Sequence, residues 1–291
     1  MDWLYALATQ AVEQGWLNES FGYAFMVNAV VAAMVLGPLL GGLGTLVIAK
    51  RLAFFSEAVG HAAITGIAIG ILLGESPDSP VIGLFSFCLV FAILLHFVRN
   101  RTQVPYDTLV GVFLAVALAM GAALLMYVAR KINVHLLENV LFGSILTVTQ
   151  QDIALLAGIC ALVLVVLLFT YNRILLSCIS PDIARVRGFS VNFYDYLFVL
   201  MITLVTIVSV KVIGAVLVGA LLLIPGATAR LMTKTNGSFV LMSAFLATLA
   251  CLGGTLIPMA FMLPIPSGAA IIMVSASFFF VATLYRMVVK G

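Results

Sequence analysis

The feature that most constrains this chain is a succession of apolar runs, most of them about twenty residues long and nearly free of charge. A bilayer core about 30 Å thick needs about 20 apolar residues per helical span, whereas the strands of a membrane barrel alternate over about ten. Because 64% of the side chains are hydrophobic and 9% are charged, against about 25% charged in a soluble domain, no soluble fold could bury them. The sequence therefore predicts an all-α, polytopic membrane protein.

Nine candidate spans follow one another along the chain, and the charges between them set their direction. The spans lie at about 22–49, 53–74, 80–98, 107–128, 151–171, 193–210, 212–230, 238–259 and 268–287. If the first span runs inward, eleven of the fourteen Lys and Arg residues fall inside, and only Arg130, Lys131 and Lys211 fall outside. This split follows the positive-inside rule. At Lys211 two spans meet with almost no loop, so eight spans with one irregular segment are the alternative.

The segments outside these spans predict no soluble domain. Residues 1–20 form a mildly amphipathic stretch with Trp3, Tyr5 and Trp16, which is typical of a helix lying at the lipid interface. The net charge of +3 is what basic cytoplasmic loops produce, so no nucleic-acid partner is implied. Since neither a repeat nor a low-complexity tract is visible, we expect one transmembrane domain over residues 1–291.

One acid and one histidine stand out in the second span. Glu57 and His61 are four residues apart and share a helix face, with Thr65 one turn further along it. A charge at the centre of a span costs about 2.5–3.5 kcal/mol, so it should face a partner or a water-filled path. A carboxylate and an imidazole both ligate zinc and manganese, and a twofold axis would double them to four ligands. The pair is a candidate pore-lining metal site; the alternative is a hydrogen-bonded pair that fixes helix contacts.

The two other histidines carry weaker signals. His96 lies beside Arg99 at a predicted cytoplasmic end and is interpreted as an interfacial residue. The segment 135–149 is too short to span and too apolar for a free loop, so it predicts a short re-entrant or interfacial helix on the outer side. Within it, His135 and Glu138 are three residues apart and form a candidate metal entry site.

Small residues recur every four positions in the second span: Ala58, Ala62, Gly66, Gly70 and Gly74. Small side chains on one helix face let a neighbouring backbone come close. We therefore expect ordinary helix packing along this stripe.

The region 177–190 belongs to the longest clearly cytoplasmic connection and carries the signals of a short helix. These signals are a cap, a first-turn proline, a first-turn acid and a closing glycine: Ser180, Pro181, Asp182 and Gly188. Arg185 and Arg187 make the helix basic. Such a helix on the cytoplasmic surface is shaped to dock against another protein, and a loop held to lipid headgroups is the alternative.

Five segments carry a resemblance to a known family. They are VIAKRLAFFSEAVGHAAITGIAIG, LFGSIL, SPDIARVRGFSV, VIGAVLVGALLLIPGATARLM and PIPSGAA. In this order, over residues 25 to 285, they resemble the permease subunits of ABC importers for metal cations, the zinc, manganese and iron uptake systems of bacteria. The resemblance implies a protein of the bacterial inner membrane, a permease dimer that we take as a homodimer, cytoplasmic ATPase subunits that bind ATP, and an extracytoplasmic metal-binding protein.

Carried over by position, the resemblance implies that Glu57 and His61 are pore ligands and that 180–188 contacts the ATPase. The transported divalent ion is then cargo, and no cofactor is permanently bound. Relatives often have Asp where this chain has Glu57, and Ser where it has Gly60, so the identity of the metal stays open.

Two other functional classes compete with an ATP-driven permease. A secondary transporter or channel driven by an ion gradient should show inverted repeats and several intramembrane charges, which are not visible. A membrane metalloprotease should carry HExxH, whereas this chain has EAVGH. The chain also lacks a GxxxxGK[ST] phosphate loop, so we expect a separate subunit to hydrolyse ATP and this chain to be no enzyme.

Overall fold

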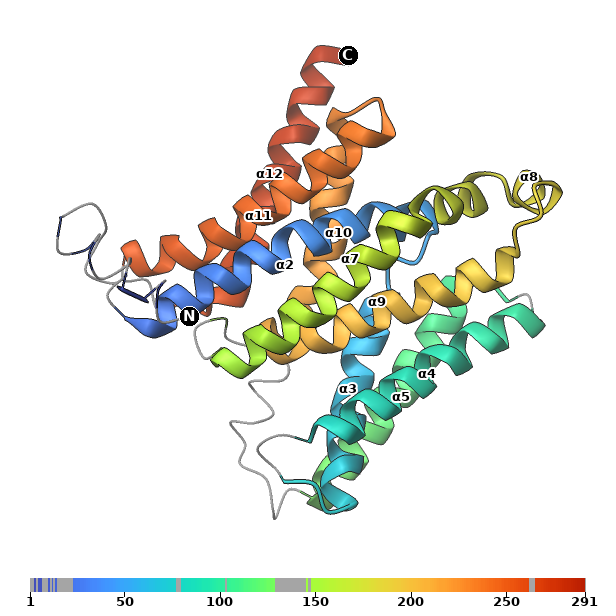
Figure 1. The fold of residues 1–291 in the computed structure, drawn as a ribbon, viewed down its shortest axis with the longest axis horizontal. Helices are drawn as coiled ribbons and strands as arrows, with labels where there is room; N and C mark the ends of the chain where they lie inside the picture. Colours follow the sequence, from blue (N-terminus) through green and yellow to red (C-terminus); the bar gives the residue numbers. More distant parts are fainter. Residues whose placement is uncertain are drawn as a thin grey trace.

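Helices form all the regular structure in the part of the chain that the computed structural model describes (Figure 1). That part comprises residues 3, 5, 6, 10, 12, 14, 23–76, 80–102, 104–128, 145, 148–261 and 265–290. Its helices are α2 (Ala24–Ala49), α3 (Phe55–Leu72), α4 (Val81–Thr102), α5 (Tyr106–Val128), α7 (Gln150–Ile179), α8 (Pro181–Val186), α9 (Val191–Ile213), α10 (Ala215–Met232), α11 (Asn236–Ala260) and α12 (Ser267–Lys290). Within these residues, nine helices are long and apolar enough to cross a membrane. The all-α, polytopic prediction is confirmed.

The fifth span is longer than the sequence predicts. We expected it to end near 171, but α7 continues to Ile179. Its last turns hold polar side chains that find partners: Arg173 donates to the Tyr194 hydroxyl of α9 at 2.9 Å, and Ser177 donates to the Ile174 carbonyl at 2.7 Å. Because these contacts satisfy the polar groups, the helix runs beyond the apolar core and reaches α8 directly.

The joint near Lys211 is a single residue between two complete helices. Gly214 separates α9 from α10 with φ 84° and ψ 157°, a backbone region that is essentially restricted to glycine. Lys211, in the last turn of α9, forms an ion pair with Asp152 at the start of α7, with 2.7 Å between Nζ and Oδ1. Two separate spans, of 23 and 18 residues, therefore replace the irregular segment that was the alternative.

Close backbone contacts confirm the packing role of Gly66 and Gly70 in the small-residue stripe, whereas Gly74 lies beyond the end of α3 with open space around it. A Cβ added to Gly83 of α4 would lie 2.4 Å from the Cα of Gly70, and one added to Gly66 would lie 2.9 Å from the Gly83 carbonyl oxygen. In the same way, a Cβ on Gly44 of α2 would lie 2.1 Å from the Leu222 carbonyl oxygen of α10. Helices α2, α3 and α10 therefore meet their neighbours at distances that larger side chains forbid.

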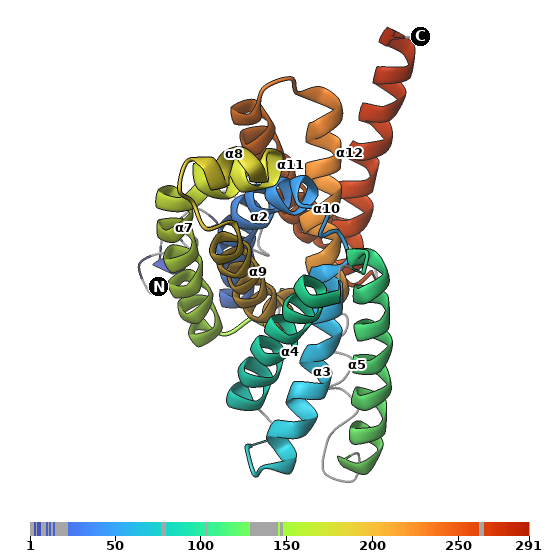
Figure 2. The ribbon, with the colours of Figure 1, turned by 90° about the vertical axis from the view of Figure 1, so that its right-hand side faces the viewer.

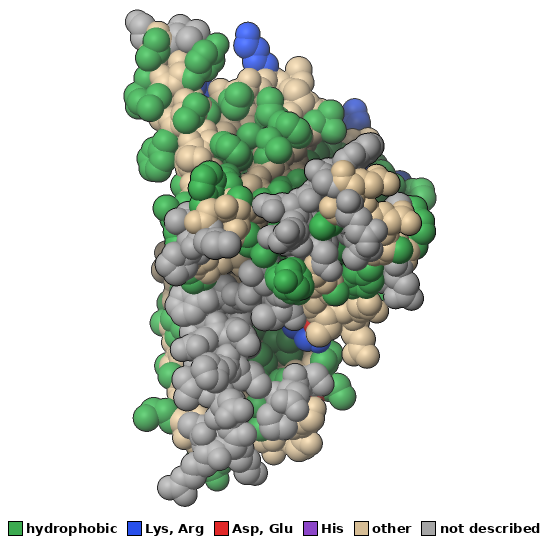
Figure 3. Space-filling model, turned by 90° about the vertical axis from the view of Figure 1, so that its left-hand side faces the viewer, with side chains coloured by type: hydrophobic (Ala, Val, Ile, Leu, Met, Phe, Trp, Pro, Cys, Tyr) green, Lys and Arg blue, Asp and Glu red, His purple; other side chains and the backbone are tan. Residues whose placement is uncertain are grey.

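The helix ends that the charge distribution predicts to be cytoplasmic gather at one end of the molecule. In Figure 1, α8 and the connection between α4 and α5 lie at the right, where α2 and α7 also end. Figure 2 views this end directly and shows α8 beside α7, with α9 and α4 below it. On the opposite end, shown in Figure 3, hydrophobic side chains dominate among those described.

The amino-terminal segment is described only in part. Trp3, Tyr5 and Ala6 are helical, which agrees with the expected interfacial helix as far as these residues reach. The Tyr5 hydroxyl donates to the Asn28 side chain at 2.6 Å and accepts from the Gln150 amide at 3.2 Å. The segment is thereby tied to the first turns of α2 and α7.

Candidate transport site and cytoplasmic cavity

Helix α3 exposes one narrow strip that carries Glu57 and His61. Both side chains are half-buried, whereas their helical neighbours from Phe55 to Ala68 are buried. The next half-buried position is Ile69, which lies about 120° around the helix axis from Glu57, so the strip comprises Glu57 and His61 alone. Glu57 also stands in the first turn of α3, where the partial positive charge of the helix amino terminus favours a carboxylate.

Small residues of α10 run beside this strip. A Cβ built on Gly219 would lie 3.8 Å from the Cβ of Glu57, and one built on Gly60 would lie 3.2 Å from the Cβ of Ala215. The absence of larger side chains at these α10 positions leaves room around the carboxylate. The strip is therefore bordered by backbone and small groups on the α10 side.

The Glu57 carboxylate and the His61 ring do not bind each other in the described part of the chain. Within the described residues, no hydrogen bond or ion pair joins Glu57 to His61, and the buried Nδ1 atom of His61 has no hydrogen-bond partner. A buried polar atom is normally paired in a native structure. The geometry thus gives no support to a hydrogen-bonded structural pair and leaves a ring nitrogen available as a ligand atom.

Thr65 does not belong to the strip, contrary to the spacing argument. Its side chain is completely buried, and its hydroxyl donates to the Ala117 carbonyl of α5 at 2.8 Å. A Cβ on Gly121 would lie 2.9 Å from the same hydroxyl oxygen, so α5 packs closely over this position. The contact between α3 and α5 turns Thr65 into a packing residue.

One copy of the chain offers only two ligands at this strip. Among the described residues, no group of three or more His, Cys, Asp and Glu side chains is placed to hold a metal ion. The candidate entry pair, His135 and Glu138, lies outside the described residues. A four-ligand site at Glu57 and His61 consequently requires a second permease subunit.

Helix α8 has the form that the sequence predicts. Ser180 is its N-cap residue and Pro181 its first residue, although the Ser180 side chain makes no capping hydrogen bond. Gly188 follows with φ 78°, as expected for a closing glycine. Arg185 pairs with Asp182 at 3.1 Å, and both side chains are exposed. Arg187 is exposed as well, so the helix presents a basic surface.

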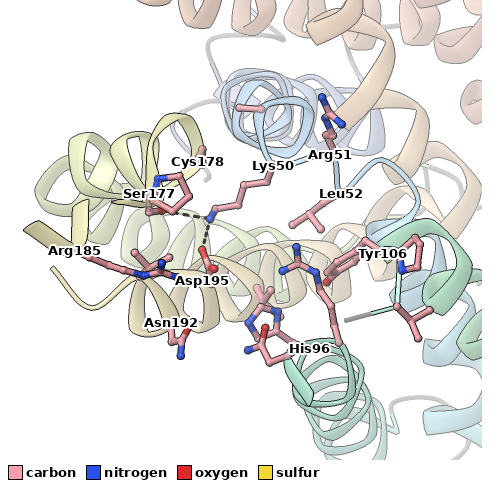
Figure 4. Close-up of a pocket in the computed structure, with 18 residues that line it drawn as sticks. Lys50, Arg51, Leu52, His96, Tyr106, Ser177, Cys178, Arg185, Asn192 and Asp195 are labelled. Atoms are coloured by element: carbon pink, nitrogen blue, oxygen red, sulfur yellow. Dashed lines mark hydrogen bonds and ion pairs between the residues drawn. The ribbon is translucent and has the colours of Figure 1, made fainter. Parts of the chain in front are cut away.

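A polar cavity of about 750 Å³ lies behind α8 and was not predicted (Figure 4). Lys50, at the end of α2, extends across it to an ion pair with Asp195 of α9 and also contacts the Ser177 hydroxyl of α7 at 3.4 Å. His96, expected at the interface, is instead 2% exposed and lines this cavity. The walls come from separate parts of the sequence, so spacing alone could not have revealed them.

Comparisons with known proteins identify the family. The model of the ABC 3 transport family matches residues 22–286. The manganese import system permease protein ScaB of Streptococcus gordonii is 30% identical over 260 residues, 89% of this chain and 91% of the relative. The high-affinity zinc uptake system membrane protein ZnuB of Haemophilus influenzae is 29% identical over 264 residues, 91% of this chain and 98% of the relative. The solved structure of PsaBC from Streptococcus pneumoniae in complex with Fab includes a chain with a TM-score of 0.78 and 27% identity, covering 95% of this chain and 94% of that one. Together with the nine apolar helices, these matches show that the chain is a multi-pass membrane protein that belongs to the ABC 3 transport family.

Proposed function

We propose that this chain is the permease subunit of an ATP-driven importer that moves divalent manganese or zinc into the cytoplasm. The relatives named for manganese import and zinc uptake support this class, and a gradient-driven transporter has no comparable support. The observation that carries the proposal is the strip on α3. On the part of α3 from Phe55 to Ala68, which is otherwise buried, a carboxylate and an imidazole share the exposed face, and the imidazole has an unused buried nitrogen.

The strip gives the ion a path if two copies face each other. A twofold axis would bring together two carboxylates and two imidazoles from Glu57 and His61. The carboxylates offset the charge of the dehydrated ion, while the small ligand number keeps binding weak enough for release. Because His61 lies about 6 Å further from the cytoplasmic end of α3 than Glu57, an incoming ion would meet the imidazole first.

The chemistry of the pair is compatible with both metals. Carboxylates suit manganese and imidazoles suit zinc, and each chain contributes one of each. The similarity to the manganese relative and to the zinc relative is also nearly equal, at 30% and 29% identity. Competition between the two ions in one transport assay is therefore needed to separate them, and iron belongs in the same competition.

The deciding experiment measures uptake of radioactive manganese and zinc into proteoliposomes that contain the whole complex. Loss of a single supporting residue around a metal often weakens metal affinity about 10- to 100-fold. We expect Glu57→Gln and His61→Ala to reduce transport by about tenfold or more, with normal expression and assembly. Asp107→Asn is the matched control, because Asp107 is an exposed acid in the first turn of another spanning helix. Wild-type rates for both ions in the two strip variants would show that the ion passes elsewhere.

The same proposal assigns the partners of the permease. In this proposal the exposed helix α8 would contact a cytoplasmic ATPase, and an extracytoplasmic metal-binding protein would deliver the ion at the opposite end. Replacing Arg185 and Arg187 by Glu should reduce co-purification of the ATPase or uncouple ATP hydrolysis from uptake. Arg286→Glu, a single charge reversal at an exposed position near the end of α12, is the control for each of the two substitutions made alone. If both charge reversals leave assembly and uptake unchanged, α8 is not the coupling contact.

A further inference from the structure

We propose that the cytoplasmic cavity behind α8 is a binding site for a phosphate-class oxyanion, held by Arg99, His96 and Tyr106. None of these residues takes part in the metal path or in the exposed surface of α8. The inference therefore does not depend on the function proposed for Glu57 and His61. It rests on the hydrogen-bonding groups and the charges that line the cavity.

Two side chains in the cavity wall, His96 and the partly exposed Tyr106, have buried polar atoms without partners. His96 is 2% exposed, and neither ring nitrogen makes a hydrogen bond within the described residues. The Tyr106 hydroxyl is also buried and unpaired there. Both residues line the cavity, and Figure 4 shows them on the side away from α8. Since buried polar groups are almost always paired in native proteins, a bound group with acceptor atoms is expected at this place.

Positive charge is in excess around these two side chains. Lys50 is neutralised by Asp195, and Arg185 is paired with Asp182. For Arg99, by contrast, no carboxylate lies within ion-pair distance among the described residues. Its guanidinium carbon lies 4.9 Å from the centre of the Tyr106 ring, so the cation stacks over the face of that ring at the cavity wall.

Arg51 adds a further cation to the lining, again without an ion-pair partner in the described part of the chain. It is also the one non-glycine residue with a positive φ among the described residues, at 57°. A divalent cation in this cavity would meet unbalanced positive charge. The site is therefore unsuited to the transported metal and suited to an anion.

The donor set selects an oxyanion with several acceptor oxygens. The Arg99 guanidinium presents a planar fork of N–H groups, which matches phosphate geometry, and it cannot lose its charge. A neutral imidazole donates one N–H, and the tyrosine donates its O–H. A free inorganic phosphate and the headgroup of an anionic phospholipid present the same oxygens to these donors. Experiment must therefore distinguish which of the two molecules binds.

The first arm of the test uses the purified full chain in detergent without phospholipid. Thermal unfolding is followed with a thiol-reactive dye, because Cys88, Cys160 and Cys251 are buried in the folded protein. Sodium phosphate is compared with sodium chloride at equal ionic strength. We expect phosphate to raise the unfolding temperature of the wild type. In Arg99→Gln the apparent phosphate Kd should rise by about tenfold or more, as for loss of a charged hydrogen bond.

Two further variants serve as a control and as a second test of the site. Arg101→Gln is the matched control, because Arg101 lies on the same helix, is exposed, and stacks near Phe97 outside the cavity. It should respond to phosphate like the wild type. Tyr106→Phe removes only the hydroxyl and keeps the ring, so it carries the test if Arg99→Gln fails to fold, and it too should lose most of the phosphate response.

The second arm reconstitutes the chain in nanodiscs of phosphatidylglycerol or phosphatidylcholine and detects retained lipid by native mass spectrometry. Protection by free phosphate identifies a soluble anion, whereas Arg99-dependent retention of phosphatidylglycerol alone identifies a headgroup; either result supports the site. The proposal fails if neither arm shows Arg99-dependent binding or if Arg101→Gln loses as much as Arg99→Gln. It also fails if zinc, but not phosphate, protects in a His96-dependent way, or if Arg99→Gln changes only ATPase co-purification.

Discussion

The ion pair between Lys50 and Asp195 offers a quantitative test of the cytoplasmic end of the fold. It joins α2 to α9, and the Ser177 hydroxyl brings in α7. The two side chains are 10% and 19% exposed, so each charge depends on the other for most of its stabilisation. Lys50 also lies 5.5 Å from the centre of the Phe198 ring, an arrangement that favours a cation there.

Removing one partner should lower the free energy of unfolding far more than removing both. Breaking a buried ion pair by a single substitution costs about 3–5 kcal/mol, and the residual exposure and the Ser177 contact point to about 3 kcal/mol for Asp195→Asn. At about 2–4 °C for each kcal/mol, the unfolding temperature should fall by about 6–12 °C. The double variant Lys50→Met with Asp195→Leu leaves no buried charge and should lie within about 1 kcal/mol of the wild type.

A double-mutant cycle on thermal unfolding in detergent measures this coupling. Lys50→Met, Asp195→Leu and the combination are compared with the wild type under identical conditions. If each single change costs about 3 kcal/mol and the combination about 1 kcal/mol, the coupling should be about 5 kcal/mol, larger than for most contacting residues. Additive effects of the two single changes, to within about 0.5 kcal/mol, would refute the view that the pair is a buried, mutually dependent unit.

Three further substitutions probe packing, strain and the outer end. Gly83→Ala should destabilise the protein by about 1–3 kcal/mol, because its Cβ would clash with the α3 backbone, whereas Gly111→Ala, with open space around it, should raise the unfolding temperature slightly. Arg51→Gly should stabilise by about 1 kcal/mol, since it relieves the positive φ; a lower unfolding temperature would instead show that the side chain makes a larger contribution. Lys211→Met should cost about 1 kcal/mol or less at low salt and nothing measurable at high salt, because its pair with Asp152 is partly exposed.

The spans were predictable because membrane thickness and the positive-inside rule act on every helix in the same way. The short helix after Ser180 was also predictable, because proline, acid and glycine each have a fixed place in a helix. The end of α7 was not, since its last turns depend on the hydroxyl of Tyr194, a residue of another helix. The position of Thr65 was wrong for a similar reason: spacing defines a helix face, but only the approach of α5 decides which part of that face is covered.

The two candidate sites differ in how far the sequence alone could predict them. Glu57 and His61 lie on one helix, so their spacing predicts a shared face, and their role in metal transport stays a prediction. The cavity behind α8 combines His96 with Tyr106 and Lys50, which come from different helices. Each of these residues has an ordinary explanation on its own, as an interfacial histidine, an aromatic residue near a span end and an inside lysine. Only their meeting in space reveals unpaired donors around one cavity.

Because Gly214 alone joins α9 to α10, the number of residues at this junction determines how α10 is rotated about its own axis. An α-helix turns by about 100° for each residue, so one residue inserted here would rotate α10 by that amount about its own axis. Gly219 would then turn away from Glu57, and larger side chains of α10 would take its place beside the carboxylate. Because only Gly214 separates α9 from α10, the end of α9 fixes which α10 residues face Glu57. A longer connection would hold α10 in this rotation less tightly.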